Sequence, residues 1–347
     1  MGNRIKARET ALLALLAIAR CWSPGGAAAS QPAWLESGSF KWRCGPPVLS
    51  APRRPPETCY SIKDPSIVRY AGQWHLFCTI RAKERSHRIE YLRFSSWDQT
   101  REARRFMLHL TNGYFCAPQV FFFQPQRRWY MILQVIDKSR KPSLQPAFST
   151  TTKITDPESW SEPRLLFEKQ PARVKQWIDF WAITSDGRTY LFFTSHDGRL
   201  WRASTDVRSF PKGWSEPQVA LRADIFEAAH IYRLAGLKKF LAIIEARGPE
   251  GRRYYKAFTA ERLDGKWRPL AASWEKPFAS QVNVIFTGRP WTDSFSHGEL
   301  LRCGFDQRLA VDPENLRFLF QGVSTEGRRG VPYGRIPWRL GLLEPLP

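Results

Sequence analysis

Long apolar runs are missing from this sequence, and so is the 3.6-residue apolar period of a long amphipathic helix. The most apolar segment, residues 11–19, is far shorter than the roughly 20 residues that a helix needs to cross a bilayer. Only six cysteines occur, and no two of them have the close spacing of a zinc site. These absences argue against a helical bundle, a membrane-spanning helix and a zinc-binding module.

Aromatic and aliphatic residues, by contrast, are plentiful. Hydrophobic residues make up 43% of the 347 residues and aromatic residues 14%, which is enough for a large buried core. A disordered chain is therefore excluded. The length fits one large all-β domain or two average domains, so it does not decide the number of domains.

The first 29 residues have the three parts of a secretory signal peptide. Basic residues precede the apolar run at 11–19, and three alanines at 27–29 provide a small-residue cleavage site. Cys21 suggests a lipid anchor at first sight, but Arg20 before it is a poor fit to the small residue that lipoprotein processing needs. We therefore expect residues 1–29 to be removed and the protein to be secreted to the extracellular space without a membrane anchor.

Positive charge is the strongest compositional bias. The formal net charge is +21, and removing the signal peptide leaves the chain strongly basic. Such a charge is typical of nucleic-acid binders, of proteins that adhere to anionic surfaces, and of proteins adapted to acidic or salty surroundings. The arginines are scattered rather than gathered in one basic helix or arm. Attraction to acidic polysaccharide or cell envelope is therefore favoured, and we expect no nucleic-acid partner.

Five cysteines remain after the signal peptide is removed, so at least one thiol is unpaired. Cys44 and Cys59 flank a loop rich in proline and arginine. A disulfide between them would stabilise the fold by roughly 3 kcal/mol on the chain-entropy argument. Cys78 and Cys116 lie in apolar strands and are expected to be buried thiols.

From residue 61 onward, a unit repeats about every fifty residues. Each copy has a polar or acidic residue, an alternating apolar strand, a polar turn and an aromatic second strand. We expect regular strands to begin near Ile62, after a proline-rich lead-in at residues 30–60 that packs on the domain. Clear copies start at Asp64, Ala117, Asp179 and Glu227, and a weaker fifth copy covers residues 281–320.

Five units of four short strands predict an all-β protein, a five-bladed β-propeller over residues 61–347. The sequence Trp-Ser-Glu-Pro occurs at residues 160–163 and again at 214–217, at matching unit ends, which supports a true repeat. A two-sheet sandwich explains this spacing less easily.

The repeat places three carboxylates around one axis, because the first strand of every propeller blade lines the central channel. Asp64, Asp179 and Glu227 then face one another across a funnel, as acid/base chemistry on a glycosidic bond requires. Each also has a structural interpretation, since Asp before Pro65 is often a turn former. Asp179 and Glu227 stand next to aromatic residues, where an acid without a function would be costly to bury.

Several ordered motifs resemble glycoside hydrolase family 62, which are secreted α-L-arabinofuranosidases on a five-bladed propeller. The resemblance covers about residues 40–345. The motifs are Lys-Asp-Pro-Ser at 63–66, Tyr-Phe-Cys-Ala-Pro-Gln-Val-Phe at 114–121, Trp-Ile-Asp-Phe-Trp at 177–181, Phe-Glu-Ala-Ala-His at 226–230 and Ser-His-Gly-Glu at 296–299.

The resemblance implies removal of single L-arabinofuranose branches from arabinoxylan, with inversion at the anomeric carbon. Asp64 would be the general base that activates water, Glu227 the general acid that protonates the leaving oxygen, and Asp179 the residue that orients and tunes them. Lys63 and Tyr333 would contact the sugar. A solvated charge at a strand end and an exposed turn tyrosine would look the same in sequence.

The resemblance also implies a calcium ion in the channel, with His297 as its protein contact. Calcium prefers oxygen ligands, so most of its shell would be water, with Gln119 nearby. Glu299 would support His297, and His230 and His75 are expected to be packing residues.

Two departures from the family pattern stand out. The fourth unit has alanine, rather than serine, before His230, and the basic loop at 137–145 differs from the usual one and is expected at the polymer-binding rim. Two alternatives stay open, a related propeller glycosidase acting on other furanosides or xylosides, and a non-catalytic carbohydrate-binding propeller. We expect a monomer in either case.

Overall fold

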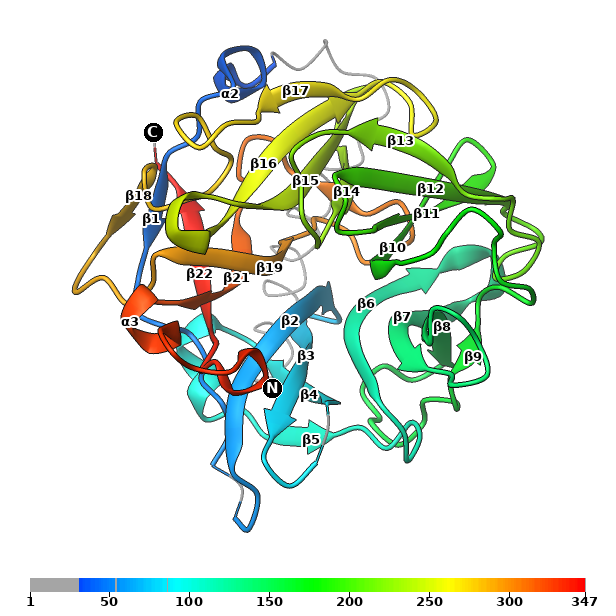
Figure 1. Cartoon of the computed structure of the whole chain (residues 1–347), viewed down its shortest axis with the longest axis horizontal. Helices are drawn as coiled ribbons and strands as arrows, with labels where there is room; N and C mark the ends of the chain where they lie inside the picture. Colours follow the sequence, from blue (N-terminus) through cyan, green and yellow to red (C-terminus); the bar gives the residue numbers. More distant parts are fainter. Residues whose placement is uncertain (1–30, 54, 86, 347) are drawn as a thin grey trace, which may run out of the picture.

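Five sheets, in which most neighbouring strands are antiparallel, stand around a central axis, as the blades of a propeller do (Figure 1). The computed structural model describes residues 31–53, 55–85 and 87–346, so the predicted signal peptide lies outside the described residues. The prediction of an all-β, five-bladed β-propeller is confirmed. No helix in the described ranges is long and apolar enough to cross a membrane.

The first three blades are four-stranded meanders whose strands pair in chain order. Blade 1 contains β2 (Cys59–Tyr70), β3 (Gln73–Ala82), β4 (Arg88–Phe94) and β5 (Arg105–Met107); blade 2 contains β6 (Phe115–Phe123), β7 (Arg128–Ile136), β8 (Leu144–Thr151) and β9 (Arg164–Leu165); blade 3 contains β10 (Ile178–Ser185), β11 (Arg188–Thr194), β12 (Arg199–Asp206) and β13 (Gln218–Arg222).

The last two blades have five strands each because distant segments join them. Blade 4 contains β14 (His230–Leu234), β15 (Phe240–Arg247), β16 (Arg253–Ala260), β17 (Arg268–Ala271) and β20 (Ala310–Val311); blade 5 contains β19 (Ser294–Leu300), β21 (Phe318–Val323), β22 (Arg339–Pro345), β1 (Trp42–Cys44) and β18 (Val284–Phe286). The short helices are α2 (Ala33–Ser37), α3 (Thr325–Arg328) and the 3-10 turns Trp97–Arg101, Gln124–Gln126, Pro249–Gly251 and Tyr333–Arg335.

The lead-in segment closes the ring. Strand β1 lies between β22 and β18, so the two ends of the chain share blade 5 (Figure 1). Trp42 of β1 is almost fully buried, and its indole N–H donates to the carbonyl of Phe278 at 2.5 Å. The expectation that regular strands begin near Ile62 is therefore wrong, because a three-residue strand precedes that point.

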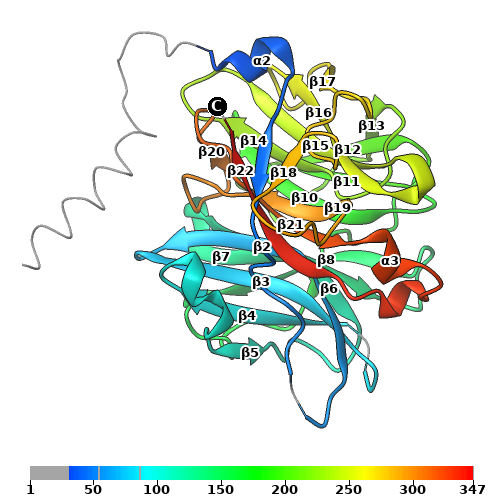
Figure 2. The same cartoon turned by 90° about the vertical axis from the view of Figure 1, so that its left-hand side faces the viewer.

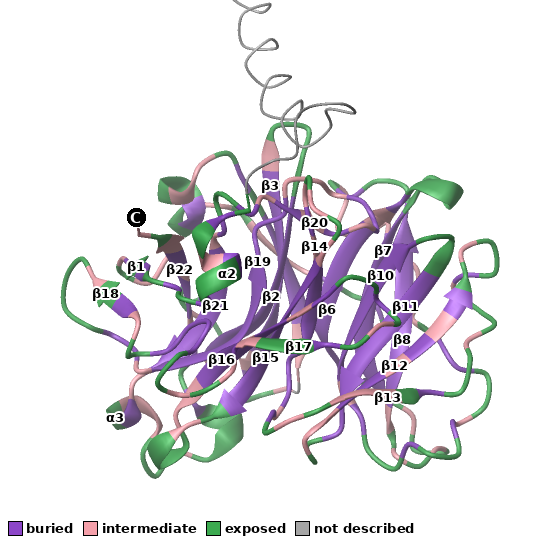
Figure 3. Cartoon of the chain, turned by 90° about the horizontal axis from the view of Figure 1, so that it is seen from above, coloured by how far each residue is buried: buried purple, intermediate pink, exposed green. Residues whose placement is uncertain are grey.

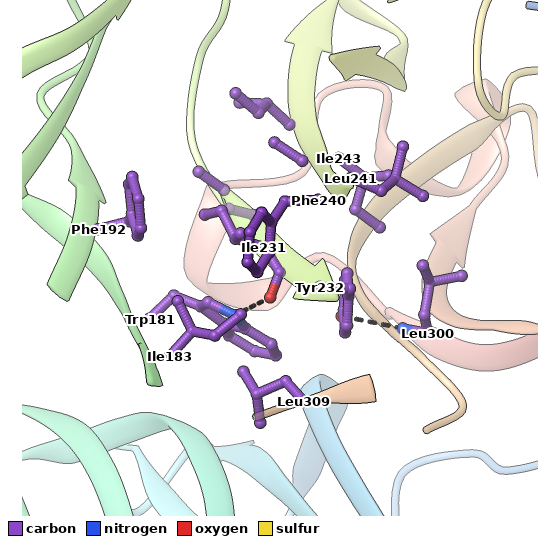
Figure 4. Close-up of a cluster of buried hydrophobic side chains, with 14 of the residues drawn as sticks. Trp181, Ile183, Phe192, Ile231, Tyr232, Phe240, Leu241, Ile243, Leu300 and Leu309 are labelled. Atoms are coloured by element: carbon purple, nitrogen blue, oxygen red, sulfur yellow. Dashed lines mark hydrogen bonds between the residues drawn. The ribbon is translucent and has the colours of Figure 1, made fainter. Parts of the chain in front are cut away.

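Aromatic and aliphatic side chains fill the space between the blades, and the strands are buried along most of their length (Figure 3). Between blades 3 and 4, Trp181 packs on Tyr232 and donates its indole N–H to the carbonyl of Ile231 at 2.8 Å (Figure 4). The Tyr232 hydroxyl accepts the N–H of Leu300 from blade 5 at 3.0 Å. Neighbouring blades are therefore joined by packing and by directional bonds.

Cys44, Cys78 and Cys116 are buried and form no disulfide bonds. Cys44 is a buried free thiol, so the disulfide to Cys59 that the sequence left open is not formed. Its side chain points from β1 into the core, while Cys59 begins a strand of another blade. Burial raises the pKa of Cys44 to about 12 despite a hydrogen bond with Trp291. Cys78 and Cys116 are buried thiols, as predicted.

One end of the channel is closed by the segment that leads into β20. Its carbonyls accept backbone N–H groups from three inner strands: Phe305 from Phe122, Gln307 from Thr184 and Leu309 from Arg233. Above it, Arg302 is fully buried and pairs with Glu299 at 2.6 Å. Helix α3 and the loop after β21 lie at the opposite end (Figure 2). We therefore expect a ligand to approach from the end that carries α3.

At the open end, the inner strands turn sharply at equivalent positions. Asp64, Ala117, Asp179 and Ala228 have left-handed φ angles of 48°, 50°, 57° and 49°. Three of these strands also shift register against their partners there, as β-bulges do. Such a bulge re-aims the side chains of the strand, and here it directs them to the channel mouth.

Hydrogen bonds from each blade to the next hold these bulges. The backbone N–H at the bulge donates to a polar side chain on the second strand of the preceding blade. The pairs are Asp64 with Gln321 (2.8 Å), Ala117 with Thr79 (2.9 Å), Asp179 with Gln134 (3.0 Å) and His297 with Glu245 (2.9 Å). The bulges of blades 1, 2, 3 and 5 are therefore tied into one network.

Candidate active site

Asp64 of blade 1 lies at the channel mouth and is 6% exposed. Burial alone would raise its pKa, but the charges of Lys63 and His297 and a hydrogen bond from Thr79 outweigh burial, so the pKa of Asp64 is lowered. The carboxylate form of Asp64 is therefore favoured. An ionised, oriented carboxylate can accept a proton from a water molecule.

The pKa of Asp179, in blade 3, is shifted in the opposite direction from that of Asp64. Burial and the nearby carboxyl groups of Glu227 and Asp64 raise its pKa well above the usual value. Its Oδ2 accepts the backbone N–H of Ala228 at 3.0 Å, and its Oδ1 lies 3.4 Å from the Gln134 amide nitrogen. Asp179 therefore binds blade 4 directly at the residue that follows Glu227.

His297 of blade 5 joins the two aspartates. Its Nδ1 lies 3.4 Å from Asp64 Oδ1 and 3.8 Å from Asp179 Oδ2. Blades 1, 3 and 5 therefore meet at this imidazole. His230, whose ring centroid is 5.1 Å from that of His297, packs on Trp181.

Glu227 of blade 4 completes the trio and is 8% exposed. Its Oε1 lies 3.5 Å from an Arg253 guanidinium nitrogen, and its Oε2 lies 2.9 Å from His196 Nε2. The expectation that Glu227 shares the repeat position of Asp64 and Asp179 is wrong by one residue, because Ala228 has the equivalent left-handed backbone. The bulge of blade 4 therefore presents the preceding side chain.

A buried ion pair that the sequence did not reveal supports Glu227. Arg253 NH1 lies 2.9 Å from Glu245 Oε1, and the other oxygen of Glu245 accepts the Ser296 hydroxyl and the His297 N–H. Burial raises the pKa of Glu245 to about 7; Arg253 opposes this effect and Glu227 adds to it. Arg253 and Glu245 thus connect the predicted acid to the blade that holds His297.

Lys63 and Tyr333 lie beside Asp64. The Lys63 ammonium is 5.4 Å from the centroid of the Tyr333 ring. Lys63 is 8% exposed, whereas Tyr333, in the loop between β21 and β22, is 57% exposed. Burial would lower the pKa of Lys63, but the charge of Asp64 and other anionic groups raises it. Both side chains lie near one another at the channel mouth, and their sugar-binding roles stay predictions.

Two of the residues predicted near a calcium ion, Gln119 and Glu299, are engaged by other groups of the protein. Gln119 uses its amide oxygen and nitrogen on the backbone of Ala182, and Glu299 binds Arg302 and the N–H of Ile67. Within the described ranges, no three His, Cys, Asp or Glu side chains are grouped to hold a metal. Calcium prefers six to eight oxygen ligands, so His297 would supply a single contact to the ion. The ion stays a prediction, with water as its main ligand.

The remaining predicted residues are placed as follows. His75 is a packing residue, as expected, with its Nδ1 2.8 Å from the Tyr91 hydroxyl. The basic loop at 137–145 joins β7 to β8 at the open end, as expected, but Arg140 is used locally on the carbonyls of Phe167 and Glu168. Its lysines remain exposed at the rim.

Comparison with known proteins agrees with this geometry. Residues 48–344 match the family described as Glycosyl hydrolase family 62. Alpha-L-arabinofuranosidase C of Cellvibrio japonicus (strain Ueda107) is 36% identical over 311 residues, which cover 88% of this chain and 47% of that protein. The chain therefore spans about half the length of this curated relative.

Two solved structures are similar over nearly their whole length. The catalytic domain of the Coprinopsis cinerea GH62 α-L-arabinofuranosidase has a TM-score of 0.83 at 36% identity, covering 88% of this chain and 97% of that one. The α-L-arabinofuranosidase of Podospora anserina, solved in complex with cellotriose, has a TM-score of 0.82 at 32% identity, covering 89% and 98%. The chain belongs to glycosyl hydrolase family 62.

Proposed function

We propose that this protein is an α-L-arabinofuranosidase that removes single arabinofuranose branches from arabinoxylan with inversion at the anomeric carbon. The observation that carries the proposal is the meeting of Asp64, Asp179 and Glu227 at one buried channel mouth. Family membership supports it, since the compared relatives from Cellvibrio japonicus, Coprinopsis cinerea and Podospora anserina are all α-L-arabinofuranosidases.

In this proposal, Asp64 is the general base. Its lowered pKa keeps it ionised, so it can take a proton from a water molecule as the water oxygen bonds to the anomeric carbon. Glu227 donates its proton to the glycosidic oxygen while the bond from that oxygen to the anomeric carbon breaks. Exchange with solvent then returns a proton to Glu227 and removes one from Asp64.

Asp179 positions the acid rather than reacting with the sugar. Its Oδ2 holds the N–H of Ala228, which fixes the backbone directly after Glu227. Lys63 and Tyr333 flank the base and supply an ammonium and a ring edge to hold the arabinose. No step in this scheme depends on a metal ion.

Arabinose release from arabinoxylan tests the proposal, with Asp64→Asn and Glu227→Gln as variants. Each should lower kcat by roughly 10²–10⁴-fold, the usual contribution of one acid or base. Asp264→Asn is the matched control, because this carboxylate pairs with Arg262 on an exposed loop between β16 and β17 and should keep the wild-type rate. Proton NMR of the first-formed sugar distinguishes inversion from retention.

A wild-type protein that binds arabinoxylan but releases no arabinose would support the carbohydrate-binding alternative. Full activity in both Asp64→Asn and Glu227→Gln would contradict the assignment of acid and base. We also propose secretion after removal of residues 1–29 and a monomeric state. N-terminal mass spectrometry of the exported protein and sedimentation analysis test these two points.

A further inference from the structure

A histidine that the scheme above does not use lies against the predicted acid. His196 is in the turn after β11 and has a left-handed φ of 59°. Its ring stacks on Phe226, with centroids 4.6 Å apart and 10° between the planes, and its Nε2 is 2.9 Å from Glu227 Oε2. The His196 side chain is 27% exposed. The imidazole is therefore more exposed to solvent than the Glu227 side chain, which is 11% exposed.

The other nitrogen of this ring also has a partner. Nδ1 lies 2.9 Å from the side-chain amide nitrogen of Gln176, which can only donate. In this arrangement the neutral ring carries its proton on Nε2 and donates it to Glu227. Half a rotation of the exposed Gln176 amide would present its oxygen instead, which accepts a proton on Nδ1. Gln176 can therefore stabilise the ring in either protonation state.

We propose that His196 is a positioning residue that shares a proton with Glu227 and returns it to the acid after each turnover. The inference rests on the proposed function, in which Glu227 is the general acid. Transfer of the Nε2 proton to Oε2 converts imidazolium and carboxylate into neutral imidazole and carboxylic acid. The ring then carries its remaining proton on Nδ1, and solvent supplies the next proton.

This arrangement keeps a proton within hydrogen-bond distance of Glu227 on the imidazole. A carboxylate at hydrogen-bond distance makes an imidazolium hold its proton more tightly, so the pair titrates as a unit. Asp179 also faces His196 and acts in the same direction when ionised. Arg247 and Arg253, which lie over the Phe226 ring at 3.7 and 4.2 Å, act against it.

Arg253 is itself paired with Glu245 at 2.9 Å, which limits its opposition. The neighbouring Asp197, which would act in the same direction as Glu227, is paired with Arg199 at 3.3 Å. The closest charged group to the imidazole is therefore Glu227 itself, at 2.9 Å. We therefore expect the contact between His196 and Glu227 to determine where the proton resides.

The pH profile of kcat/KM on arabinoxylan tests the inference with His196→Gln. The glutamine amide can still donate to Glu227 but cannot carry the extra proton. We expect the alkaline limb to move to lower pH, so that a small loss at pH 5 grows to about tenfold at pH 7.5. Asp197→Asn, in the same turn but without contact to Glu227, should leave the limb in place. A loss that is equal at all pH values would overturn the inference.

A second measurement separates this inference from the proposed function. NMR titration of the His196 imidazole in the wild type should give a higher pKa than in Glu227→Gln, because the substitution removes the carboxylate. Identical titrations would refute proton sharing, whatever the enzyme hydrolyses. Failure of the wild type to release arabinose would refute the proposed function, while the titration would still decide whether the two side chains are coupled.

Discussion

Substitution of Glu245 by glutamine should have an effect on stability that depends strongly on pH. Glu245 is fully buried, and burial raises its pKa from an ordinary 4.5 to about 7. Below pH 4.5 the group is protonated in both folded and unfolded chains, so it does not make stability depend on pH. Between pH 4.5 and 7 the unfolded chain loses the proton first, so the folded state becomes less stable as pH rises.

The size of this effect follows from the raised pKa. One pKa unit corresponds to about 1.4 kcal/mol, so Glu245 should lower the free energy of unfolding by about 3 kcal/mol between pH 4.5 and pH 8. A glutamine side chain at this position cannot ionise and lacks this contribution. The difference in free energy of unfolding between Glu245→Gln and the wild type should therefore shift by about 3 kcal/mol in favour of the variant over that range.

Urea unfolding followed by tryptophan fluorescence at pH 4.5, 6 and 8 measures the shift. Glu344→Gln is the control, because Glu344 pairs with Arg43 at an exposed site and should change stability by less than about 1 kcal/mol at every pH. A difference for Glu245→Gln that is constant with pH would refute the reasoning. So would a shift of the opposite sign, which would mean that the bond to Arg253 outweighs burial.

Three further predictions concern the base, the ring closure and calcium. Lys63→Met removes the main charge that lowers the pKa of Asp64, so the acid limb of kcat/KM should move to higher pH; an unmoved limb would contradict this role. Trp42→Ala should lower the free energy of unfolding in urea by about 3–5 kcal/mol, because it leaves a cavity where β1 packs in blade 5. Arg43→Ala, at an exposed position of the same strand, should lower it little. Equal losses in the two variants would contradict this prediction. Calcium titration of EGTA-treated protein by calorimetry should give a binding heat that His297→Ala loses, and equal heats in both proteins would place any ion elsewhere.

The blades could be predicted because each repeats a local pattern. Aromatic second strands such as 189–193 and 240–244 recur at matching positions in the sequence. The closing strand could not be predicted in this way. Trp42 pairs with residues more than two hundred positions away, and a three-residue strand has no period of its own. The pairing of β1 with β18 and β22 becomes apparent only in the folded structure.

The repeat pattern could locate only the side chains that begin each unit. Asp64, Asp179 and Glu227 were found from their place in the units, although the bulge of blade 4 shifts Glu227 by one residue. Arg253 begins the third strand of blade 4, and His196 is in a polar turn that looks like any other turn. Their contacts arise from packing between blades, which no local pattern contains.

The bulges explain why the predicted base occupies the left-handed position of its strand, whereas the predicted acid occupies the residue before that position. Ala117 and Ala228 adopt the left-handed backbone without a polar side chain that could favour it, so the bulge belongs to the inner strands rather than to the chemistry. Each such residue costs of order 1–3 kcal/mol, which the hydrogen bonds between blades offset. Asp64 and Asp179 use the bulge position itself, whereas Glu227 uses the position before it. The acid is therefore aimed differently from the two aspartates, with His196 and Arg253 on its two oxygens, and its protonation can be set separately from that of the base.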